Sequence, residues 1–339
     1  MARTADPIFI VSSERSGSNL LRVLLGNHSQ LHAPVAPQFL MNFAPLVPYY
    51  GDWNDAETGR RLVGDMTRLA GHEQYAWQVS EPDRNQPFRG WLDCFHWMYA
   101  QDAERNGKVR FVCKENKLFD FVAELANYYA QPRFIYLYRD PRAYVASWLQ
   151  VPLLSQSEYV IARRWSEEQR QCLTAFITFR RPFFAISYER LVADTRSHME
   201  SLLRFVGEPW EEACAQTDPQ AAQEAARNPY WKNLDKPIDS SKLDEFRRRL
   251  TTGQLRLIES VTRHEMRTLG YPLLTTADWK PSRWFFAKDK LVHYWRACKQ
   301  RWRHRNSIGM LRDRAKLMDQ IREQRKAEIG EPLAMGEHH

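Results

Sequence analysis

The sequence predicts an α/β fold, in which helices cover both faces of a parallel sheet. Short apolar runs alternate along most of the chain with stretches that have helical periodicity. Two of the apolar runs lead through a short loop directly into a helix, which is the unit from which parallel sheets are built. With 339 residues, 43% of them hydrophobic, the chain has enough material for one large domain with additions.

Apolar composition identifies four strands, and apolar residues at spacings of three and four identify three helices. The predicted strands are residues 8–12, 109–113, 133–138 and 183–187. The predicted helices are residues 18–27, 141–149 and 196–206. Gly207 and Pro209 end the last helix, because neither residue favours another turn.

The loop after the first strand has the composition of a phosphate-binding loop. Residues 12–19 read SSERSGSN and open into an apolar-periodic helix. Backbone N–H groups at a helix start carry partial positive charge, and small residues let an anion approach them closely. The unit is therefore P-loop-like, although the Gly-x-x-x-x-Gly-Lys-Ser/Thr motif is missing and Arg15 is the cation of the loop. The alternative is that Arg15 is a surface residue beside an ordinary tight turn.

A second loop has a related layout. Residues 133–138 read as a buried strand that runs into Arg139-Asp140-Pro141. Asp140 suits the N-cap of the following helix and Pro141 its first turn. Arg139 and Ser147, two turns along that helix, are expected to face one crevice at the carboxyl edge of the sheet, where ligands of open α/β sheets bind. An ion pair between Arg139 and Asp140 is the alternative.

These two motifs resemble the cofactor motifs of sulfotransferases that use 3′-phosphoadenosine 5′-phosphosulfate (PAPS). Residues 13–21 resemble the loop that binds the 5′-phosphosulfate. Arg139-Asp140-Pro141, with Ser147 eight residues after the arginine, resembles the motif that binds the 3′-phosphate.

A third resemblance lies late in the fold, in residues 186–191 and 203–210. The similarity extends over roughly residues 7–272 and looks most like bacterial members of the carbohydrate or lipid type. A segment that often closes over the cofactor in such relatives includes Trp231, Lys232 and Lys242 here.

The resemblance implies transfer of a sulfuryl group from PAPS to a hydroxyl of a carbohydrate, lipid-linked or small-molecule acceptor. The reaction is an in-line displacement that leaves adenosine 3′,5′-bisphosphate (PAP) and requires no metal. The cofactor residues implied are Arg15, Ser16, Gly17, Ser18 and Asn19 around the 5′-phosphosulfate, Arg139 and Ser147 around the 3′-phosphate, and Tyr188 near the adenine. Tyr188 is equally consistent with a core tyrosine.

The resemblance also implies a catalytic lysine at the end of the second predicted strand, where this chain has Lys114; a solvated lysine is the alternative. Animal cytosolic relatives have a histidine two residues later, at the position of Asn116. Heparan-type relatives have an acid after the first helix, but residues 34–40 contain none. The remaining candidates for the base are Glu115, whose pKa burial would raise, then His32 and His28, each of which also suits a structural role.

Two segments are additions to a minimal fold. Residues 41–108 hold eleven aromatic side chains, which predict a helical insertion with an aromatic core or an acceptor cleft that stacks on sugar rings or acyl chains. We therefore expect a sulfotransferase domain over residues 1–275, with 41–108 on its acceptor side, and a basic aromatic helical extension over residues 276–339.

Basic charge is concentrated in this extension. The net charge of the chain is +8, and residues 280–329 alone carry 15 Lys or Arg against 5 Asp or Glu. The aromatic residues there are Trp284, Phe285, Phe286, Tyr294, Trp295 and Trp302. They favour a segment that packs on the domain or lies on a membrane surface over a nucleic-acid arm, because a solvated arm needs fewer bulky aromatic residues.

The sequence predicts a cytoplasmic protein and leaves peripheral membrane contact through the extension open. No run approaches the ~18 apolar residues of a membrane span, and the first six residues lack the apolar core of a signal peptide. The cysteines are odd in number and widely spaced, which indicates neither disulfides nor zinc. They are Cys94, Cys113, Cys172, Cys214 and Cys298.

Two other functions remain consistent with the sequence. One is an ATP-dependent, P-loop kinase-like enzyme, which would need Mg²⁺ and a Walker lysine; the missing lysine and the Arg139/Ser147 pair count against it. The other is a catalytically degenerate protein that holds PAP, or that contacts membranes or polyanions through its basic extension. The missing family base keeps this alternative open.

Overall fold

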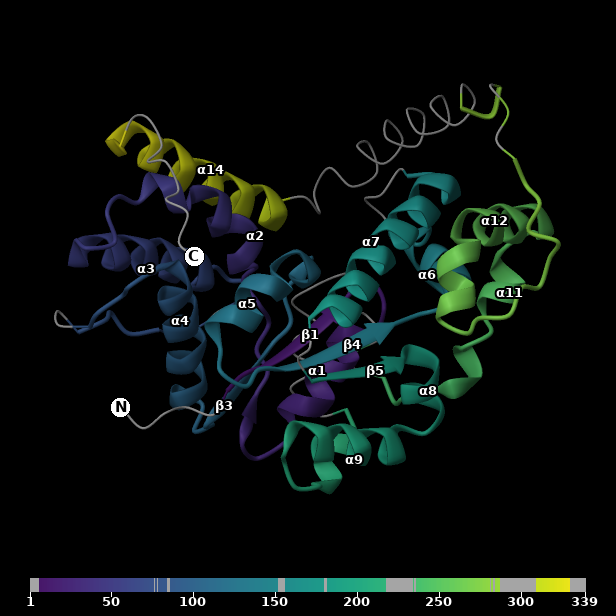
Figure 1. Ribbon diagram of the computed structural model, residues 1–339, viewed down its shortest axis with the longest axis horizontal. Coiled ribbons are helices and arrows are strands. Elements are labelled where there is room, and N and C mark those ends of the chain that lie inside the picture. Colours follow the sequence, from purple (N-terminus) through teal and green to yellow (C-terminus); the bar gives the residue numbers. More distant parts are fainter. Residues whose placement is uncertain are drawn as a thin grey trace.

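The computed structural model describes residues 6–75, 77, 79–83, 86–151, 156–179, 182–217, 234, 236–280, 282, 284–286 and 309–329. A five-stranded parallel sheet lies at its centre, which confirms the predicted α/β class (Figure 1). In spatial order the strands are β2 (Leu31–His32), β3 (Arg110–Cys113), β1 (Ile8–Ser12), β4 (Arg133–Tyr138) and β5 (Phe183–Ser187).

Helices connect the strands and cover the sheet. The α-helices are α1 (Ser18–Gly26), α2 (Phe39–Phe43), α3 (Ala56–Ala70), α4 (Trp91–Arg105), α5 (Val122–Tyr128), α6 (Pro141–Trp148), α7 (Glu158–Thr178), α8 (Tyr188–Ala193), α9 (Thr195–Val206), α11 (Phe246–Arg249), α12 (Thr252–Thr268) and α14 (Gly309–Ile329). Short 3₁₀ helices are η1 (Ala44–Tyr49), η2 (Leu118–Phe121), η3 (Glu212–Ala215) and η5 (Ser240–Lys242). No helix in these described segments is both long and apolar enough to span a bilayer.

The two faces of the sheet pack against different helices. Successive side chains of a strand point to opposite faces. Ile8 and Ile10 of β1 therefore pack with α1 and α9, whereas Phe9 and Val11 belong to a larger core that includes α3, α4 and α5. Figure 1 shows α7 and α9 on opposite sides of the sheet.

Most predicted elements agree with the structure to within one residue. The predicted strands 8–12, 133–138 and 183–187 coincide with β1, β4 and β5, and β3 begins one residue later than predicted. The sequence pattern did not predict β2, which has only two residues and cannot show a strand period. It also did not predict α7 and α12, whose buried residues are spread among many charged ones.

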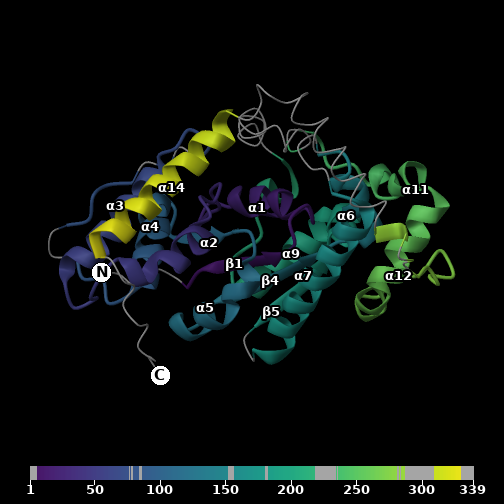
Figure 2. The ribbon, with the colours of Figure 1, turned by 90° about the horizontal axis from the view of Figure 1, so that it is seen from above.

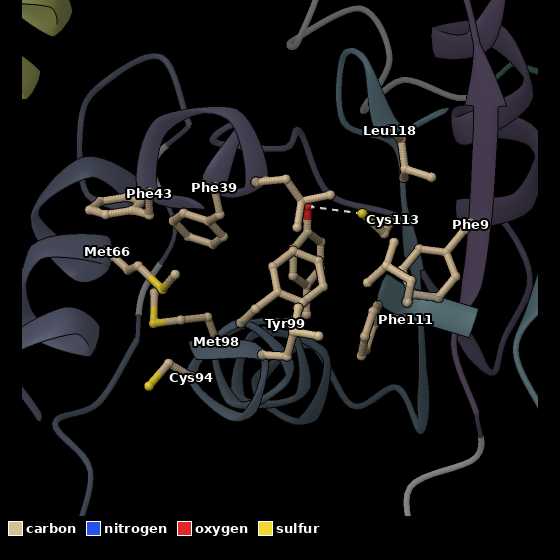
Figure 3. Close-up of a cluster of buried hydrophobic side chains, with 14 of the residues drawn as sticks. Phe9, Phe39, Phe43, Met66, Cys94, Met98, Tyr99, Phe111, Cys113 and Leu118 are labelled. Carbon is tan, nitrogen blue, oxygen red and sulfur yellow. Dashed lines mark hydrogen bonds between the residues drawn. The ribbon is translucent and has the colours of Figure 1, made fainter. Parts of the chain in front are cut away.

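Aromatic residues of the 41–108 insertion form a core that is continuous with the core under the sheet. Eight of the eleven are buried there: Phe43, Tyr50, Tyr75, Trp77, Phe88, Phe95, Trp97 and Tyr99. The Tyr99 ring stacks on Phe111 of β3 with ring centroids 4.9 Å apart, and its hydroxyl accepts from the Cys113 thiol (Figure 3). These side chains therefore form part of the hydrophobic core and pack α3 and α4 against the sheet.

The C-terminal helix α14 lies across this insertion (Figure 2). It contacts η1 and α3, and it buries Met318 and Ile321 in the same core. Of the extension's aromatic residues, Trp284 is 85% exposed, whereas Tyr294, Trp295 and Trp302 lie outside the described residues. The described part of α14 is thus packed on the domain.

Candidate active site

A pocket of about 720 Å³ opens where β1, β3, β4 and β5 end. It brings together residues that the sequence places up to 300 positions apart, from Glu14 to Arg314. The predicted site residues that line it are Arg15, Gly17, Ser18, Asn19, Lys114, Arg139, Ser147 and Tyr188. Ser16, Glu115 and His32 are not among its lining residues.

The loop between β1 and α1 holds two residues in a left-handed backbone conformation, which only glycine adopts freely. Arg15 and Gly17 both have positive φ, 64° and 90°. A side chain at position 17 would also meet the ring of Tyr188, since a Cβ there would lie 2.6 Å from Cε2. The Ser16 hydroxyl is buried and has no hydrogen-bond partner in the described residues. The loop thus has an unused hydroxyl donor beside the start of α1, whose first turn contains no acid.

The two predicted anion motifs touch each other. Arg15 donates from Nε and Nη2 to Oγ of Ser147, at 3.3 and 3.2 Å. Arg139 donates from Nη1 to the Arg15 carbonyl at 3.0 Å, and its guanidinium lies 4.4 Å from the ring centroid of Tyr188. Nε of Arg139 is buried without a partner in the described residues.

The alternative ion pair of Arg139 with Asp140 is absent from the described residues. Asp140 caps α6 by accepting from the Arg142 backbone N–H, and its carboxylate pairs with the Arg142 guanidinium at 2.6 Å. Arg142 also pairs with Glu259 at 2.7 Å. Asp140 is therefore committed to the helix start, which leaves Arg139 directed at the pocket.

The pocket is electropositive. Its charged lining consists of Arg15, Lys114, Arg139, Arg164, Lys236, Lys242, Arg249 and Arg314 against Glu14, Asp239 and Glu245. Burial, and next the neighbouring Arg139, lower the pKa of Arg15. Two close guanidinium groups destabilise each other unless an anion lies between them, so the geometry fits a bound phosphate or sulfate group.

Lys114 belongs to a hydrogen-bonded chain at the end of β3. Its Nζ donates to Oδ1 of Asn116 at 2.8 Å, and Nδ2 of Asn116 donates to Oε1 of Glu14 at 2.5 Å. The Asn116 backbone N–H donates to Gln38 at 2.6 Å. Burial lowers the pKa of Lys114 to about 8, partly opposed by the charge of Glu14. The ammonium is thus oriented toward the pocket by neutral Asn116 and retains its charge at neutral pH.

Glu115 points away from the pocket. Its carboxylate accepts from the backbone N–H groups of Phe39 and Leu40, at 2.8 and 2.7 Å, and from the Tyr99 hydroxyl at 3.1 Å. Burial raises the pKa of Glu115 to about 7, although these hydrogen bonds favour the charged form. The residue thus holds the start of α2, and with it Gln38, in place.

The histidine candidates also lie outside the pocket lining. His32 in β2 forms a 2.6 Å contact from Nε2 to Asp102 of α4. His28 is fully buried, and its Nε2 lies 3.0 Å from the Pro209 carbonyl. His32 thus connects β2 to α4, and His28 contacts the segment that follows α9.

Several pocket residues were not predicted from the sequence. Glu14 lies inside the first anion motif, so its sequence position could have identified it as a pocket residue. Lys242 was identified only as part of a segment that often covers the cofactor, while Trp231 and Lys232 lie outside the described residues. Arg314 enters from α14 and had no local signal at all.

In the described chain no group of three or more His, Cys, Asp or Glu side chains is arranged to hold a metal ion. Cys94, Cys113, Cys172 and Cys214 are buried free thiols, and Cys298 lies outside the described residues. Burial raises the pKa of each of these four thiols, so they are in the neutral form at pH 7.

Comparison with known proteins places this pocket in a family. No curated protein matches the chain. Among solved structures, the chain is similar to the sulfotransferase domain from the curacin biosynthetic pathway, with 19% identity and a TM-score of 0.54 over 79% of this chain and 98% of that one. It is also similar to the sulfotransferase domain of an olefin synthase from Synechococcus PCC 7002, with 21% identity and a TM-score of 0.48 over 79% and 96%.

At 19% identity the first likeness concerns the fold, and it agrees with the parallel sheet and flanking helices described above. The family model carries the assignment further. The model of the sulfotransferase family matches residues 7–212, more than half of the chain, and this span contains both anion motifs. The chain therefore belongs to the sulfotransferase family.

Proposed function

We propose that this protein transfers a sulfuryl group from PAPS to a hydroxyl group of an acceptor. The observation that carries the proposal is the direct contact between the two anion motifs, from Arg15 to Ser147, inside one electropositive pocket. A nucleotide with phosphate groups at both its 5′ and 3′ positions would use both motifs, whereas ATP or AMP would leave the Arg139/Ser147 motif unused.

Unsatisfied groups in the pocket lining and in the loop beside it support the fit of this cofactor. The Ser16 hydroxyl and Nε of Arg139 are buried donors without partners in the described residues, and each would gain a phosphate oxygen. Gly17 lets the Tyr188 ring pack directly against the loop, because a Cβ at this position would lie 2.6 Å from Cε2. The Tyr188 ring, held against Arg139, offers a face near which adenine would lie.

When bound, PAPS supplies an activated sulfuryl group. The protein then has to position the groups and neutralise charge, by analogy with phosphoryl transfer. We assign charge neutralisation at the leaving oxygen to Lys114, which burial prepares by weakening its hydration and which Asn116 orients. Its lowered pKa still leaves it protonated at neutral pH.

For the base that takes the acceptor's proton, we favour Glu14 over Glu115 and His32. Glu14 lines the pocket and is joined to Lys114 through Asn116. Glu115, despite a pKa near 7, has its oxygens occupied by α2 and Tyr99, and His32 contacts Asp102 outside the pocket lining. Geometry precedes pKa in choosing a base, because the group must reach the proton that it removes.

The cofactor assignment is tested by thermal unfolding with PAP, AMP and ATP. PAP at about 100 times its dissociation constant should add about 2.7 kcal/mol to the free energy of unfolding, and AMP should add much less at the same concentration. Arg139→Gln should remove the difference between PAP and AMP. Arg163→Gln is the matched control, because Arg163 is an exposed arginine of α7 paired with Glu167. Equal shifts with PAP, AMP and ATP would contradict the proposal.

The base assignment is tested by turnover with radiolabelled PAPS and a hydroxyl-bearing acceptor panel. Glu14→Gln should lower turnover by about 100-fold or more while PAP still stabilises the protein, since general-base catalysis contributes ~10²–10⁴-fold. Glu115→Gln and His32→Gln should affect stability more than turnover per folded molecule. Loss of turnover confined to Glu115→Gln would instead assign the base to Glu115.

A further inference from the structure

The C-terminal helix places a cation in the pocket from outside the segment that the family model covers. Arg314 of α14 lines the pocket, although it lies more than 100 residues beyond the matched span 7–212. Its side chain is partly buried, and its Nη1 donates to the Tyr75 hydroxyl at 3.0 Å. Figure 2 shows α14 running along the insertion that contains α3.

A buried network holds α14 in this position. Nε of Arg325 donates to Oδ2 of Asp65 on α3 at 2.7 Å, and the Tyr50 hydroxyl donates to the same oxygen at 2.9 Å. The Arg325 guanidinium also lies 5.4 Å from the Tyr50 ring centroid. Arg314 precedes Arg325 by eleven residues, about three helical turns, so both side chains lie on the same face of α14. The anchor therefore directs Arg314 toward the pocket.

Arg314 differs from the neighbouring cations of α14 in its partners. Lys316 pairs with Asp313 and Arg322 with Asp319 within the helix. Within the described chain no carboxylate lies within 4.0 Å of Arg314. Of its five N–H donors one has an acceptor there, the Tyr75 hydroxyl. A guanidinium with most of its donors turned to a pocket is suited to a ligand anion.

A second group without a hydrogen-bond partner belongs to the residue before Tyr75 in the insertion. Gln74 lines the pocket next to Tyr75, and its Oε1 is buried without a hydrogen-bond donor in the described residues. This oxygen would accept a hydrogen bond from a hydroxyl group. Together, Arg314 and Gln74 match a molecule that carries both an anionic group and a hydroxyl.

The sheet order separates this pair from the cofactor motifs. Arg139 and Tyr188 follow β4 and β5 on one side of β1, whereas Lys114 and Gln38 follow β3 and β2 on the other side. Gln74 and Arg314 belong to the insertion side, since α14 packs on η1 and α3. Arg314 is thus placed to meet the acceptor rather than the 3′-phosphate.

We propose that Arg314, presented by α14, binds an anionic group of the acceptor, so that the substrate is a hydroxylated anion. The group is a carboxylate, sulfate or phosphate, and a carboxylate fits the planar fork of arginine in a bidentate manner. This inference rests on the proposed sulfotransferase function, because it assigns the other ligand of the same pocket. It makes Arg314 a specificity residue that lies outside the family's matched span.

Binding to the full-length, PAP-saturated protein tests this inference by calorimetry with matched pairs of probes. The pairs are methyl glucuronide against methyl glucoside and hydroxybutyrate against butanediol, with glucose 6-phosphate and glucose 6-sulfate to compare the other anions. In each pair the charged member should bind about tenfold more tightly or better. The preference should weaken as salt concentration rises.

Three variants decide whether Arg314 is responsible. Arg314→Gln should abolish the preference for the charged probe, and Arg314→Lys should restore part of it. Arg312→Gln, on the exposed face of the same helix, should leave it unchanged. The inference is overturned if no charged probe binds better than its neutral partner, or if Arg314→Gln keeps the preference.

PAP binding is measured first for the wild-type protein and for each variant. A variant that binds PAP like the wild-type protein is correctly folded. If PAP fails to bind the wild-type protein, the proposed function fails. If PAP binds and the charged probes show no preference, the inference about Arg314 fails by itself.

Discussion

Replacing Gly17 by alanine tests the contribution of the cofactor loop separately from that of the rest of the fold. Gly17 has φ of 90°, and a Cβ at this position would lie 2.6 Å from Cε2 of Tyr188 and closer still to Cδ2. Gly207 at the end of α9 is the matched control, because it has φ of 85° but nothing within 4 Å of its Cβ position. Both variants carry the backbone strain, but only Gly17→Ala carries the collision.

The expected losses of stability follow from the backbone strain and from the collision with Tyr188. A left-handed conformation costs an L-residue about 1–2 kcal/mol, which is the expected destabilisation for Gly207→Ala. Carbon atoms normally approach to about 3.5–4.0 Å, so Gly17→Ala forces the Tyr188 ring aside, at a further cost of about 1–3 kcal/mol. The total for Gly17→Ala is about 2–5 kcal/mol. The displaced ring also leaves the Arg139 guanidinium, which it now faces at 4.4 Å.

PAP binding should fall with Gly17→Ala and not with Gly207→Ala. If the displaced ring no longer holds Arg139, one charge-assisted hydrogen bond from Arg139 to PAP is lost, which is worth about 1.5–3 kcal/mol and weakens binding about 10- to 150-fold. At a PAP concentration that stabilises the wild-type protein by about 2.7 kcal/mol, a variant that binds 100-fold more weakly gains about 0.4 kcal/mol.

The assay is denaturant unfolding of both variants with and without PAP. Full stabilisation of Gly17→Ala by PAP would refute the reasoning, because it would mean that PAP binding does not need the Tyr188 ring in its present position against Gly17. An equal loss of PAP binding in both variants would also refute it, since Gly207 is remote from the pocket lining.

Three further outcomes are expected. Because burial lowers the pKa of Lys114 to about 8, PAP affinity and kcat/KM should fall as pH rises through 8, and Lys114→Met should remove this alkaline limb in a binding titration. Because burial raises the pKa of Glu115 from 4.5 to about 7, ionisation favours the unfolded chain in this interval, so stability should fall as pH rises from about 4.5 to 7. Glu115→Gln should flatten that slope in urea titrations while lowering stability by ~1–3 kcal/mol, since it leaves a backbone donor of α2 unsatisfied. Asp65→Asn should destabilise the protein by ~3 kcal/mol and expose α14 to limited proteolysis, because Arg325 would lose its buried partner charge and keep only the more exposed Glu328. Unchanged proteolysis would show that α14 docks without the Arg325–Asp65 pair.

The sequence predicted the sheet and the cofactor loops because their signals are local. β1, β4 and β5 are short apolar runs with clear ends, and the helices after β1 and β4 begin with residues that suit helix starts. The eight-residue spacing from Arg139 to Ser147 is likewise a property of one helix and the residue before it. Motif reasoning could therefore expect both loops at one edge of the sheet, and the structure brings them there.

The base candidates show where local reasoning stops. Adjacent positions at a strand end point to opposite sides, so Lys114 lines the pocket and Glu115 does not. Which side faces the pocket depends on α2 and Tyr99, which supply the hydrogen bonds that hold Glu115. The sequence identified Lys114 and Glu115 as candidates, but it did not show that only Lys114 lines the pocket.

The sequence by itself determined the α/β class, the two anion loops and the family, because each depends on residues close together in the chain. Only the tertiary structure decided that the insertion's aromatic residues form a core, that Asp140 pairs with Arg142, and that α14 carries Arg314 into the pocket. These features arise from contacts between distant segments, such as Arg325 on Asp65, 260 residues away. No pattern within a single segment encodes such a contact, since its free energy exists only when both partners are buried together.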